Sequence, residues 1–359
     1  MKKRKIWKIN YLLGAMIITV LCLVTSCGRN ESVKTTGEYI RSYESERDGV
    51  PVGLFPINTG YFVFSLLDED LLGKTMRSDD LENFNEIVKD ENGYPLYELA
   101  DSFDNTICWV EYTGEKACYY AYQAENEKMI KICELSDSER VSDEADYCGI
   151  YQNNYIYMKR DSVKNCIDII SYDMDKEYMQ VMYSCDYISN LNYSLSVKGN
   201  YLSVLLGKKI LKYDLEAGQY QLLDVPSEIS APTYVDYDTD GMRYAIYDFN
   251  DKKNKIYLYD LKENNNVEVY EFPKKYKADR AKVVIKNNKI IWVNRKYHIG
   301  GGYIKYYDLK IYDIDKNVIE SIDGVFNYSF VNENELYYFT YPLPDSVNKV
   351  DMYIFSIDK

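Results

Sequence analysis

The sequence predicts an all-β fold, a β-propeller of about seven four-stranded blades that is closed by an N-terminal strand. Two observations lead to this prediction. A motif of an apolar residue, Tyr, Asp and a second apolar residue, followed by a polar turn, returns along the chain. β-Branched and aromatic residues dominate, and no hydrophobic period of 3.6 residues follows the apolar N-terminal run.

The repeat has a period in the forties. Its clearest copies are "ISYDMDKE" (170–177), "LKYDLEAG" (211–218), "YLYDLKEN" (257–264) and "KIYDIDKN" (310–317). With weaker copies near residues 80, 123 and 356, the position of the aspartate recurs about every 46 residues. Such a period, with several short strands per unit, is typical of propeller blades rather than of helical solenoids.

A single unit shows the four strands of a blade. Residues 281–321 contain "AKVVIKN", "KIIWVNRKY", "LKIYDID" and "VIESI", separated by turns and a Gly-rich loop. These strands are apolar on both sides, as expected of blades that pack face to face. The 40 tyrosines suit such sheets, because the ring is apolar and the hydroxyl can reach water.

The last repeat lacks a fourth strand. It ends at "MYIFSIDK" (352–359), after the third strand of its blade. An unpaired edge would expose backbone donors and acceptors. We therefore expect "GEYIRSYE" (37–44) to supply the outer strand of the last blade.

The N-terminus predicts a lipoprotein. Five basic residues precede an apolar run from Tyr11 to Val24, which is the layout of a signal peptide. Val24-Thr25-Ser26-Cys27 resembles the bacterial lipobox, which implies that Cys27 becomes the lipid-modified first residue. We expect a signal peptide (1–26), a polar tether (27–36) and the propeller (37–359), anchored at the extracytoplasmic face of a cell membrane.

Charge excludes one class of partner. The whole chain has a net charge of −14, and removal of the basic segment 1–26 brings it to −19. So acidic a protein repels nucleic acid, whose binding needs Lys and Arg to displace counterions. A cell-envelope protein or glycan is the expected partner.

One repeat resembles a known family. "DTDGMRYAIYDFNDKKNKIYLYDL" (238–261) has an Asp-Gly turn, an apolar strand, a polar loop and then Ile-Tyr-x-x-Asp-Leu. It resembles the repeats of TolB-like propellers, and the mature chain resembles bacterial lipoproteins built from such blades, related in form to YVTN propellers. The resemblance implies a shape and no particular activity.

Two disulfides are candidates. Six cysteines lie in the second and third repeats, without metal-binding spacing. If the turns 124–127 and 174–177 close regular hairpins, Cys118 faces Cys133 and Cys166 faces Cys185. These pairs would oxidise outside the membrane, or remain as small buried apolar residues. Cys108 and Cys148 have no predicted role.

The stretch "DYDTDG" (236–241) suggests a calcium loop. Asp236, Asp238 and Asp240 alternate before a glycine, as the first ligands of a Ca²⁺ loop do. The later ligand positions are Tyr244 and Tyr247, which cannot supply carboxylates. A hairpin closed by a turn at Asp240-Gly241 explains the same stretch of sequence without a metal ion. No other cofactor is expected.

The Gly-rich loop "HIGGGY" (298–303) suggests a ligand-binding face. It connects the second and third strands of its blade, and loops of this kind often carry binding residues in propellers. Its basic and aromatic residues could receive a carboxylate or a sugar ring: Arg295, Lys296, Tyr297, His298 and Tyr303. A plain solvated loop is the alternative.

These features predict a lipid-anchored propeller that acts as a ligand- or protein-binding module. The alternative is an envelope glycan-cleaving enzyme, a hydrolase or lyase, on the same scaffold. A structural envelope protein is a third possibility. Most templates for catalysis are absent, since the chain has one histidine and no Gly-x-Ser-x-Gly. Carboxylate pairs for glycoside cleavage stay open, because the sequence does not show which Asp and Glu side chains approach one another. No catalytic residue is therefore assigned.

Overall fold

The computed structural model of the chain describes most of the residues after position 31. The described ranges are 32–34, 37–44, 50–58, 60–67, 72–78, 85–88, 101–113, 116–141, 148–249, 254–273, 276–278, 283–296, 307–330, 334–340 and 349–357. Regular structure in them is entirely β, and no helix long and apolar enough to cross a membrane occurs in this part of the chain. The predicted signal peptide and Cys27 lie outside these ranges.

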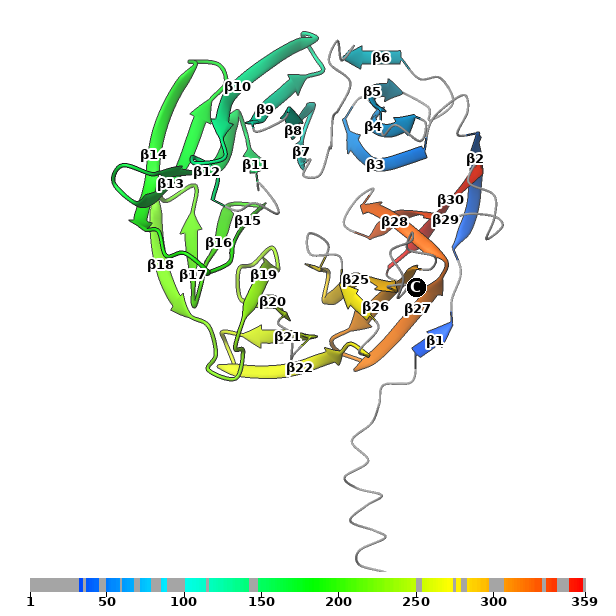
Figure 1. Cartoon of the computed structure of the whole chain (residues 1–359). Helices are drawn as coiled ribbons and strands as arrows, with labels where there is room; N and C mark the ends of the chain where they lie inside the picture. Colours follow the sequence, from blue (N-terminus) through cyan, green and yellow to red (C-terminus); the bar gives the residue numbers. More distant parts are fainter. Residues whose placement is uncertain are drawn as a thin grey trace, which may run out of the picture.

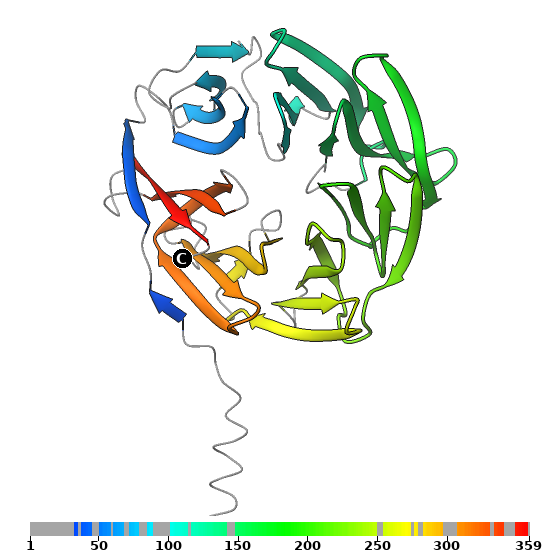
Figure 2. The same ribbon diagram turned by 180° about the vertical axis from the view of Figure 1, so that it is seen from behind.

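The strands form seven sheets arranged as a ring (Figures 1 and 2). Six sheets have four antiparallel strands, and the sheet of blade 6 has six. Along the chain, blades 1–6 run from the inner strand to the outer one, and blade 7 begins with its inner strand. In blades 1–3 the strands are β3 (Val50–Ile57), β4 (Gly60–Leu67), β5 (Leu72–Ser78) and β6 (Asn85–Val88); β7 (Asp101–Phe103), β8 (Thr106–Thr113), β9 (Lys116–Gln123) and β10 (Lys128–Ser136); β11 (Cys148–Tyr151), β12 (Asn154–Asp161), β13 (Cys166–Asp173) and β14 (Tyr178–Asp186).

The remaining blades follow the same order. In blades 4 and 5 the strands are β15 (Tyr193–Lys198), β16 (Tyr201–Leu206), β17 (Lys209–Asp214) and β18 (Gln219–Asp224); β19 (Pro232–Tyr237), β20 (Arg243–Phe249), β21 (Asn254–Asp260) and β22 (Asn265–Glu271). Blade 6 has β24 (Val284–Lys286), β25 (Lys289–Lys296), β26 (Tyr307–Asp313) and β27 (Val318–Asp323), with β23 (Tyr276–Ala278) also pairing with β25. Blade 7 has β28 (Val325–Phe330), β29 (Glu335–Thr340) and β30 (Lys349–Ser356).

The outer strand of blade 7 comes from the other end of the chain. β2 (Glu38–Glu44) pairs antiparallel with β30, so the prediction for residues 37–44 is confirmed. The first and last blades also touch, since the Leu54 backbone N–H donates to Ser329 Oγ at 3.1 Å. Part of the predicted tether is a strand as well: β1 (Ser32–Lys34) adds in parallel to the outer edge of β27.

The repeated Tyr-Asp motif marks the end of the third strand in blades 3, 4, 5 and 6. Its aspartate is the last residue of β13, β17, β21 and β26. In β17 the Asp214 carboxylate accepts the backbone N–H groups of Glu216 and Ala217, at 3.0 and 2.8 Å. The fourth turn residue has a positive φ, 65° at Gly218 and 46° at Asn264. The motif recurs because an acceptor at this point orders the turn to the outer strand.

The outer strands carry β-bulges, which the sequence motif does not reveal. The pairing of β10 with β9 shifts at Ile132, and that of β14 with β13 shifts at Met182. β22 has the same irregularity at Val269. An extra residue moves everything after it to the other face of the sheet.

The core lies between the blades. Tyr119 of blade 2 packs against Tyr155 and Tyr157 of blade 3, with ring centroids 6.2 and 5.2 Å apart. The Tyr155 hydroxyl donates to the Trp109 carbonyl at 3.2 Å. The facing sides of blades 2 and 3 are therefore buried against each other, with tyrosine rings filling the junction.

Candidate functional site

Side-chain oxygens on the inner strands hold neighbouring blades together. At each of four junctions, one such oxygen accepts a backbone N–H from the inner strand of the next blade. The acceptor and donor pairs are Asp101 with Ile150, Ser194 with Val235, Asp236 with Ile285, and Ser329 with Leu54. Two of these acceptors are carboxylates, so the inner strands carry charge as well as hydrogen bonds.

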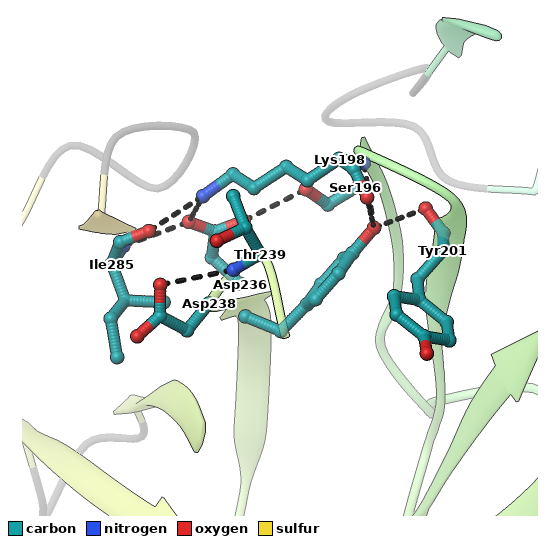
Figure 3. Close-up of polar contacts among 8 residues, drawn as sticks. Ser196, Lys198, Tyr201, Asp236, Asp238, Thr239 and Ile285 are labelled. Carbon is teal, nitrogen blue, oxygen red and sulfur yellow. Dashed lines mark hydrogen bonds and ion pairs between the residues drawn. The ribbon is translucent and has the colours of Figure 1, made fainter. Parts of the chain in front are cut away.

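Asp236 is the centre of the larger network (Figure 3). It lies near the end of β19 and is only 1% exposed. Its Oδ1 accepts a hydrogen bond from Ser196 Oγ at 2.8 Å. Its Oδ2 accepts one from the Ile285 N–H at 2.8 Å and forms an ion pair with Lys198 Nζ. Lys198 Nζ also donates to the Ile285 carbonyl at 2.8 Å. Lys198 of blade 4 thus links blades 5 and 6, because it binds both the Asp236 carboxylate and the Ile285 carbonyl.

Tyr237 completes the junction between blades 4 and 5. Its hydroxyl accepts the Lys198 backbone N–H at 2.6 Å and donates to the Tyr201 carbonyl. Burial raises the pKa of this hydroxyl well above its usual value, and the nearby Asp236 charge adds to the effect. The hydroxyl therefore stays protonated, as a donor to a backbone carbonyl must.

Asp101 begins the inner strand of blade 2. Its Oδ2 accepts the Ile150 N–H at 3.2 Å, and its Oδ1 accepts its neighbour Ser102 N–H at 2.9 Å. Part of its surface remains accessible, yet the surrounding protein atoms desolvate the carboxylate and raise its pKa from 3.8 to about 6. The charges of Lys198 and Lys286 lower that pKa and only partly offset the burial.

We call four charged residues the axial cluster: Asp101, Lys198, Asp236 and Lys286. Lys198 forms an ion pair with Asp236, and the charges of both lysines act on the Asp101 carboxylate. They come from the inner strands of blades 2, 4, 5 and 6 (Figure 1). Lys286 follows Ile285 directly, and its Nζ lies 4.6 Å from the centre of the Phe330 ring. Asp236 has a lysine within ion-pair distance, whereas the described residues give Asp101 only backbone donors.

A glycine permits the close approach of the inner strands beside Asp101. A Cβ on Gly149 would lie 2.5 Å from Val197 Cγ2 and 3.3 Å from Asp101 Oδ2. Blades 2, 3 and 4 therefore meet at a point where no other side chain fits. The glycine keeps the Asp101 carboxylate close to the third blade.

The three aspartates of the suggested calcium loop do not converge. Asp236 points to Lys198, Asp238 accepts the Thr239 N–H at 3.0 Å, and Asp240 accepts the Met242 N–H at 2.8 Å. Among the described residues no group of three His, Cys, Asp or Glu side chains could hold a metal ion. The hairpin interpretation accounts for "DYDTDG", and calcium binding stays an untested prediction.

The predicted loop site is described only at its first two residues. Arg295 and Lys296 are the last residues of β25, where their backbones pair with β23. Tyr297, His298 and Tyr303 lie outside the described residues. Their role as a ligand-binding face remains a prediction.

The cysteine pairing predicted from regular hairpins is wrong by one residue. Cys118 lies opposite Glu134 and Cys133 opposite Tyr119, while Cys166 lies opposite Asp186 and Cys185 opposite Ile167. The bulges at Ile132 and Met182 cause the shift, so the members of each predicted pair belong to opposite faces of their sheet. All six cysteines are unbonded in the structure.

Sequence reasoning missed the axial cluster and a different cysteine pair. Asp101 and Asp236 each accept an N–H from a residue 49 positions later in the sequence. This shared spacing is a signal that could have been found in the sequence. Cys108 Sγ and Cys148 Sγ, from blades 2 and 3, lie 3.8 Å apart. Alignment of the inner strands would have shown that Asp101 and Asp236 share this spacing. The contact between Cys108 and Cys148 depends on how two blades pack.

Three solved structures show similarity to the fold. A structure of prolyl endopeptidases shares 9% identity, covers 85% of this chain and 50% of its own, and has a TM-score of 0.57. TolB from Acinetobacter baumannii shares 10% identity, with 78% of this chain and 64% of its own covered and a TM-score of 0.46. The tricorn protease shares 14% identity, with 80% and 28% covered and a TM-score of 0.36.

The chain therefore spans less than two thirds of the length of each of these proteins, at 64%, 28% and 50%. No protein-family model and no curated protein matches the sequence. At such low identity the likeness concerns the fold alone. The ring of seven sheets and the likeness to the prolyl endopeptidase structure confirm that the chain has the predicted β-propeller fold.

Proposed function

We propose that this protein is a membrane-anchored, extracytoplasmic lipoprotein whose propeller binds a basic segment of a cell-envelope protein at the axial cluster. The observation that carries the proposal is the state of Asp101. Its carboxylate is desolvated enough to raise its pKa to about 6, and the described residues give it no direct cationic partner. An ammonium or guanidinium group from a ligand would supply that partner.

The comparison with Asp236 supports this choice of ligand. Asp236 accepts the same kind of interblade N–H and has Lys198 to balance its charge. Uncompensated buried charge is costly to stability, and such groups concentrate at binding and catalytic sites. The net charge of −19 expected for the mature chain would also attract a basic partner over long range.

A second observation favours a protein partner over a glycan. Large apolar side chains are exposed on the outer strands of blades 3 and 4, where unpaired edges lie on the rim. They are Tyr178, Met179 and Val181 on β14, and Tyr220 and Leu222 on β18. Exposed apolar clusters of this kind commonly mark protein contacts.

Anchoring rests on the predicted lipidation of Cys27. β1 begins five residues later, at Ser32, on the outer edge of blade 6 (Figure 1). Five residues span at most about 17 Å. A lipid on Cys27 would therefore hold the rim at blade 6 close to the membrane surface. Mass spectrometry of the cellular protein, with Cys27→Ala as the control, tests this part of the proposal.

Binding can be tested on the mature chain with a short oligolysine peptide and its lysine-acetylated form. We expect calorimetry at pH 7.5 to show binding of the charged peptide, and Asp101→Asn to weaken it by about tenfold, as expected for a charge-assisted contact of about 1.4 kcal/mol. Asp161→Asn removes the same charge from a half-buried residue at the end of β12, outside the axial cluster, and controls for general attraction. Equal effects of the two variants would contradict an axial site.

In-cell crosslinking would identify the partner. We expect one stoichiometric envelope protein to co-purify with the tethered wild type and to be lost with Asp101→Asn. Recovery of the same proteins by both forms would contradict a role for the axial cluster. Glycan fragments in place of protein would favour the alternative below.

The alternative is cleavage of an envelope glycan. It is favoured by one observation: Asp101, with a pKa of about 6, could act as a general acid near neutral pH. Asp236 would be the second carboxylate, but it is fully engaged with Lys198, Ser196 and Ile285. Release of reducing ends from cell-wall polysaccharide, abolished by Asp101→Asn, would establish this activity instead of binding alone.

A further inference from the structure

We propose that Cys108 and Cys148 form a disulfide that joins blade 2 to blade 3 in the mature protein. It goes beyond the proposed function and shares with it only the extracytoplasmic, oxidising location. The two sulfur atoms lie 3.8 Å apart, on β8 and β11 of neighbouring blades, and both residues are buried in the same core cluster. Formation of the bond needs the sulfurs to approach by a further ~1.8 Å, to the usual length of about 2.0 Å.

The four other cysteines offer no competing pair. Cys118 Sγ donates to Glu134 Oε2 at 3.8 Å, and Cys166 Sγ donates to Asp168 Oδ1 at 3.8 Å. Their hairpin partners, Cys133 and Cys185, face the opposite side of the sheet because of the bulges. Cys108 and Cys148 are thus the pair that the packing of the blades selects.

The reaction is a thiol–disulfide exchange with a low-molecular-weight disulfide or an envelope disulfide oxidase. One cysteine thiolate attacks the oxidant disulfide and releases one thiol. The second cysteine then attacks the mixed disulfide and releases the other thiol. The two cysteines lose two electrons and two protons, and the oxidant disulfide is reduced to two thiols.

The timing of this reaction follows from burial. Desolvation raises the pKa of the Cys108 thiol well above its ordinary value, so little thiolate exists in the closed ring. We therefore expect oxidation to occur as the blades fold, before they close over the pair. Once formed, the bond would be slow to reduce in the native protein.

The crosslink would stabilise the junction that carries Asp101. Cys108 lies opposite Asp101 in the pairing of β7 with β8, and Cys148 lies two residues before Ile150, whose N–H binds Asp101. A covalent bond between these strands would fix the distance between the Asp101 carboxylate and the third blade. It would also enclose a loop between residues 40 positions apart.

Peptide mapping tests the proposal. The mature chain, exported to an oxidising compartment and purified without reductant, is denatured in iodoacetamide and digested. We expect one crosslinked peptide pair containing Cys108 and Cys148, with the four other body cysteines alkylated. Reduction before alkylation should abolish that pair. Alkylation of both Cys108 and Cys148 in the unreduced sample would overturn the proposal, and so would a crosslink between any other cysteines.

A matched set of variants strengthens the test. Cys148→Ala should leave Cys108 alkylated and produce no crosslink, whereas Cys185→Ala should keep the Cys108–Cys148 peptide pair. The reduced wild-type protein, refolded with oxidised glutathione, should regain the same pair. Refolding to soluble protein with no crosslink under these conditions would also contradict the assignment.

Discussion

Asp101 and Asp236 accept equivalent interblade hydrogen bonds but have different charge partners. Each accepts the backbone N–H of a residue 49 positions later on the next inner strand, Ile150 for Asp101 and Ile285 for Asp236. Asp236 is balanced by Lys198, while the described residues offer Asp101 two backbone donors only. Asp101 thus has the same structural role with no cation at ion-pair distance among the described residues, and the charges of Lys198 and Lys286 only partly offset its desolvation. This difference is the basis of the binding role proposed for Asp101.

We predict that Asp101→Asn stabilises the protein at neutral pH. Burial raises the folded-state pKa of Asp101 from 3.8 to about 6, so the ionised carboxylate disfavours the folded state above pH 6. Two pKa units correspond to about 3 kcal/mol, and loss of one acceptor contact reduces the expected gain to about 1–3 kcal/mol. The gain should shrink as the pH falls through 6 and vanish below about 4. Urea unfolding of both proteins between pH 4 and 7.5 measures it.

Asp161→Asn is the control with the opposite sign. Hydrogen bonds from the Lys164 backbone and side chain lower the pKa of the Asp161 carboxyl. Its ionised form therefore favours folding, and this contribution is lost as the pH falls through the lowered pKa. The variant should be slightly less stable than wild type at pH 7.5. A pH-independent difference for Asp101→Asn would refute the desolvation of that carboxylate.

Tyr237 and Tyr244 provide a second matched comparison. They lie opposite each other on β19 and β20, and both are buried. The Tyr237 hydroxyl binds the backbones of Lys198 and Tyr201, whereas the Tyr244 hydroxyl is buried and has no hydrogen-bond partner among the described residues. Tyr237→Phe should lower the free energy of unfolding by about 1–3 kcal/mol, because it leaves two backbone groups unsatisfied. Tyr244→Phe should be neutral or stabilising. Chemical denaturation distinguishes these outcomes, and equal losses would show that the two hydroxyls have similar environments.

The repeat pattern was sufficient to predict the ring and its closing strand. The Tyr-Asp motif fixes the end of the third strand because its aspartate accepts turn N–H groups, as Asp214 does. That local chemistry recurs in every clear copy, so its spacing counts the blades. The missing fourth strand of blade 7 follows from the same count, since an unpaired edge requires a partner.

The site depends on contacts between blades, which the pattern within a blade does not encode. The bulges at Ile132 and Met182 change the face of Cys133 and Cys185, and no residue of the repeat motif marks where they lie. Asp101 lies in the repeat whose copy of the motif, near residue 123, is weak, and no motif marks Asp101 itself. The lysines that affect its pKa come from blades 4 and 6, far away in the sequence.

Calcium binding can be tested by thermal shift. Both Asp236 oxygens are occupied by protein donors, and Asp238 and Asp240 accept backbone N–H groups of their own turn. We therefore expect the melting temperature to be unchanged by millimolar Ca²⁺ or by a chelator. An increase with Ca²⁺ that is lost in Asp240→Asn would revive the calcium loop, because it would require these carboxylates to rearrange around the ion.

The closing strand should be essential for cooperative unfolding. β2 pairs with β30 along most of its length, and the Gly37 N–H donates to the Tyr338 hydroxyl at 2.7 Å. Deletion of residues 37–44 would expose the β30 edge and remove backbone hydrogen bonds worth about 1 kcal/mol each, a loss comparable with the whole stability of many domains. We expect calorimetry to show a lower melting temperature and a van't Hoff enthalpy that no longer equals the calorimetric one.

Two further variants distinguish the loss of the closing strand β2 from a general effect of shortening the N-terminal segment. Deletion of 32–34 removes β1, which only adds to a blade that already has its own four strands, and should change the melt little. Gly37→Ala keeps the chain length but would place a Cβ 2.3 Å from the Ile354 carbonyl oxygen, so it should weaken the docking of β2. If the 37–44 deletion melted like wild type, the pairing of β2 with β30 would contribute nothing to the ring. If both deletions destabilised equally, the loss would come from the N-terminal segment as a whole rather than from its role as the fourth strand of blade 7.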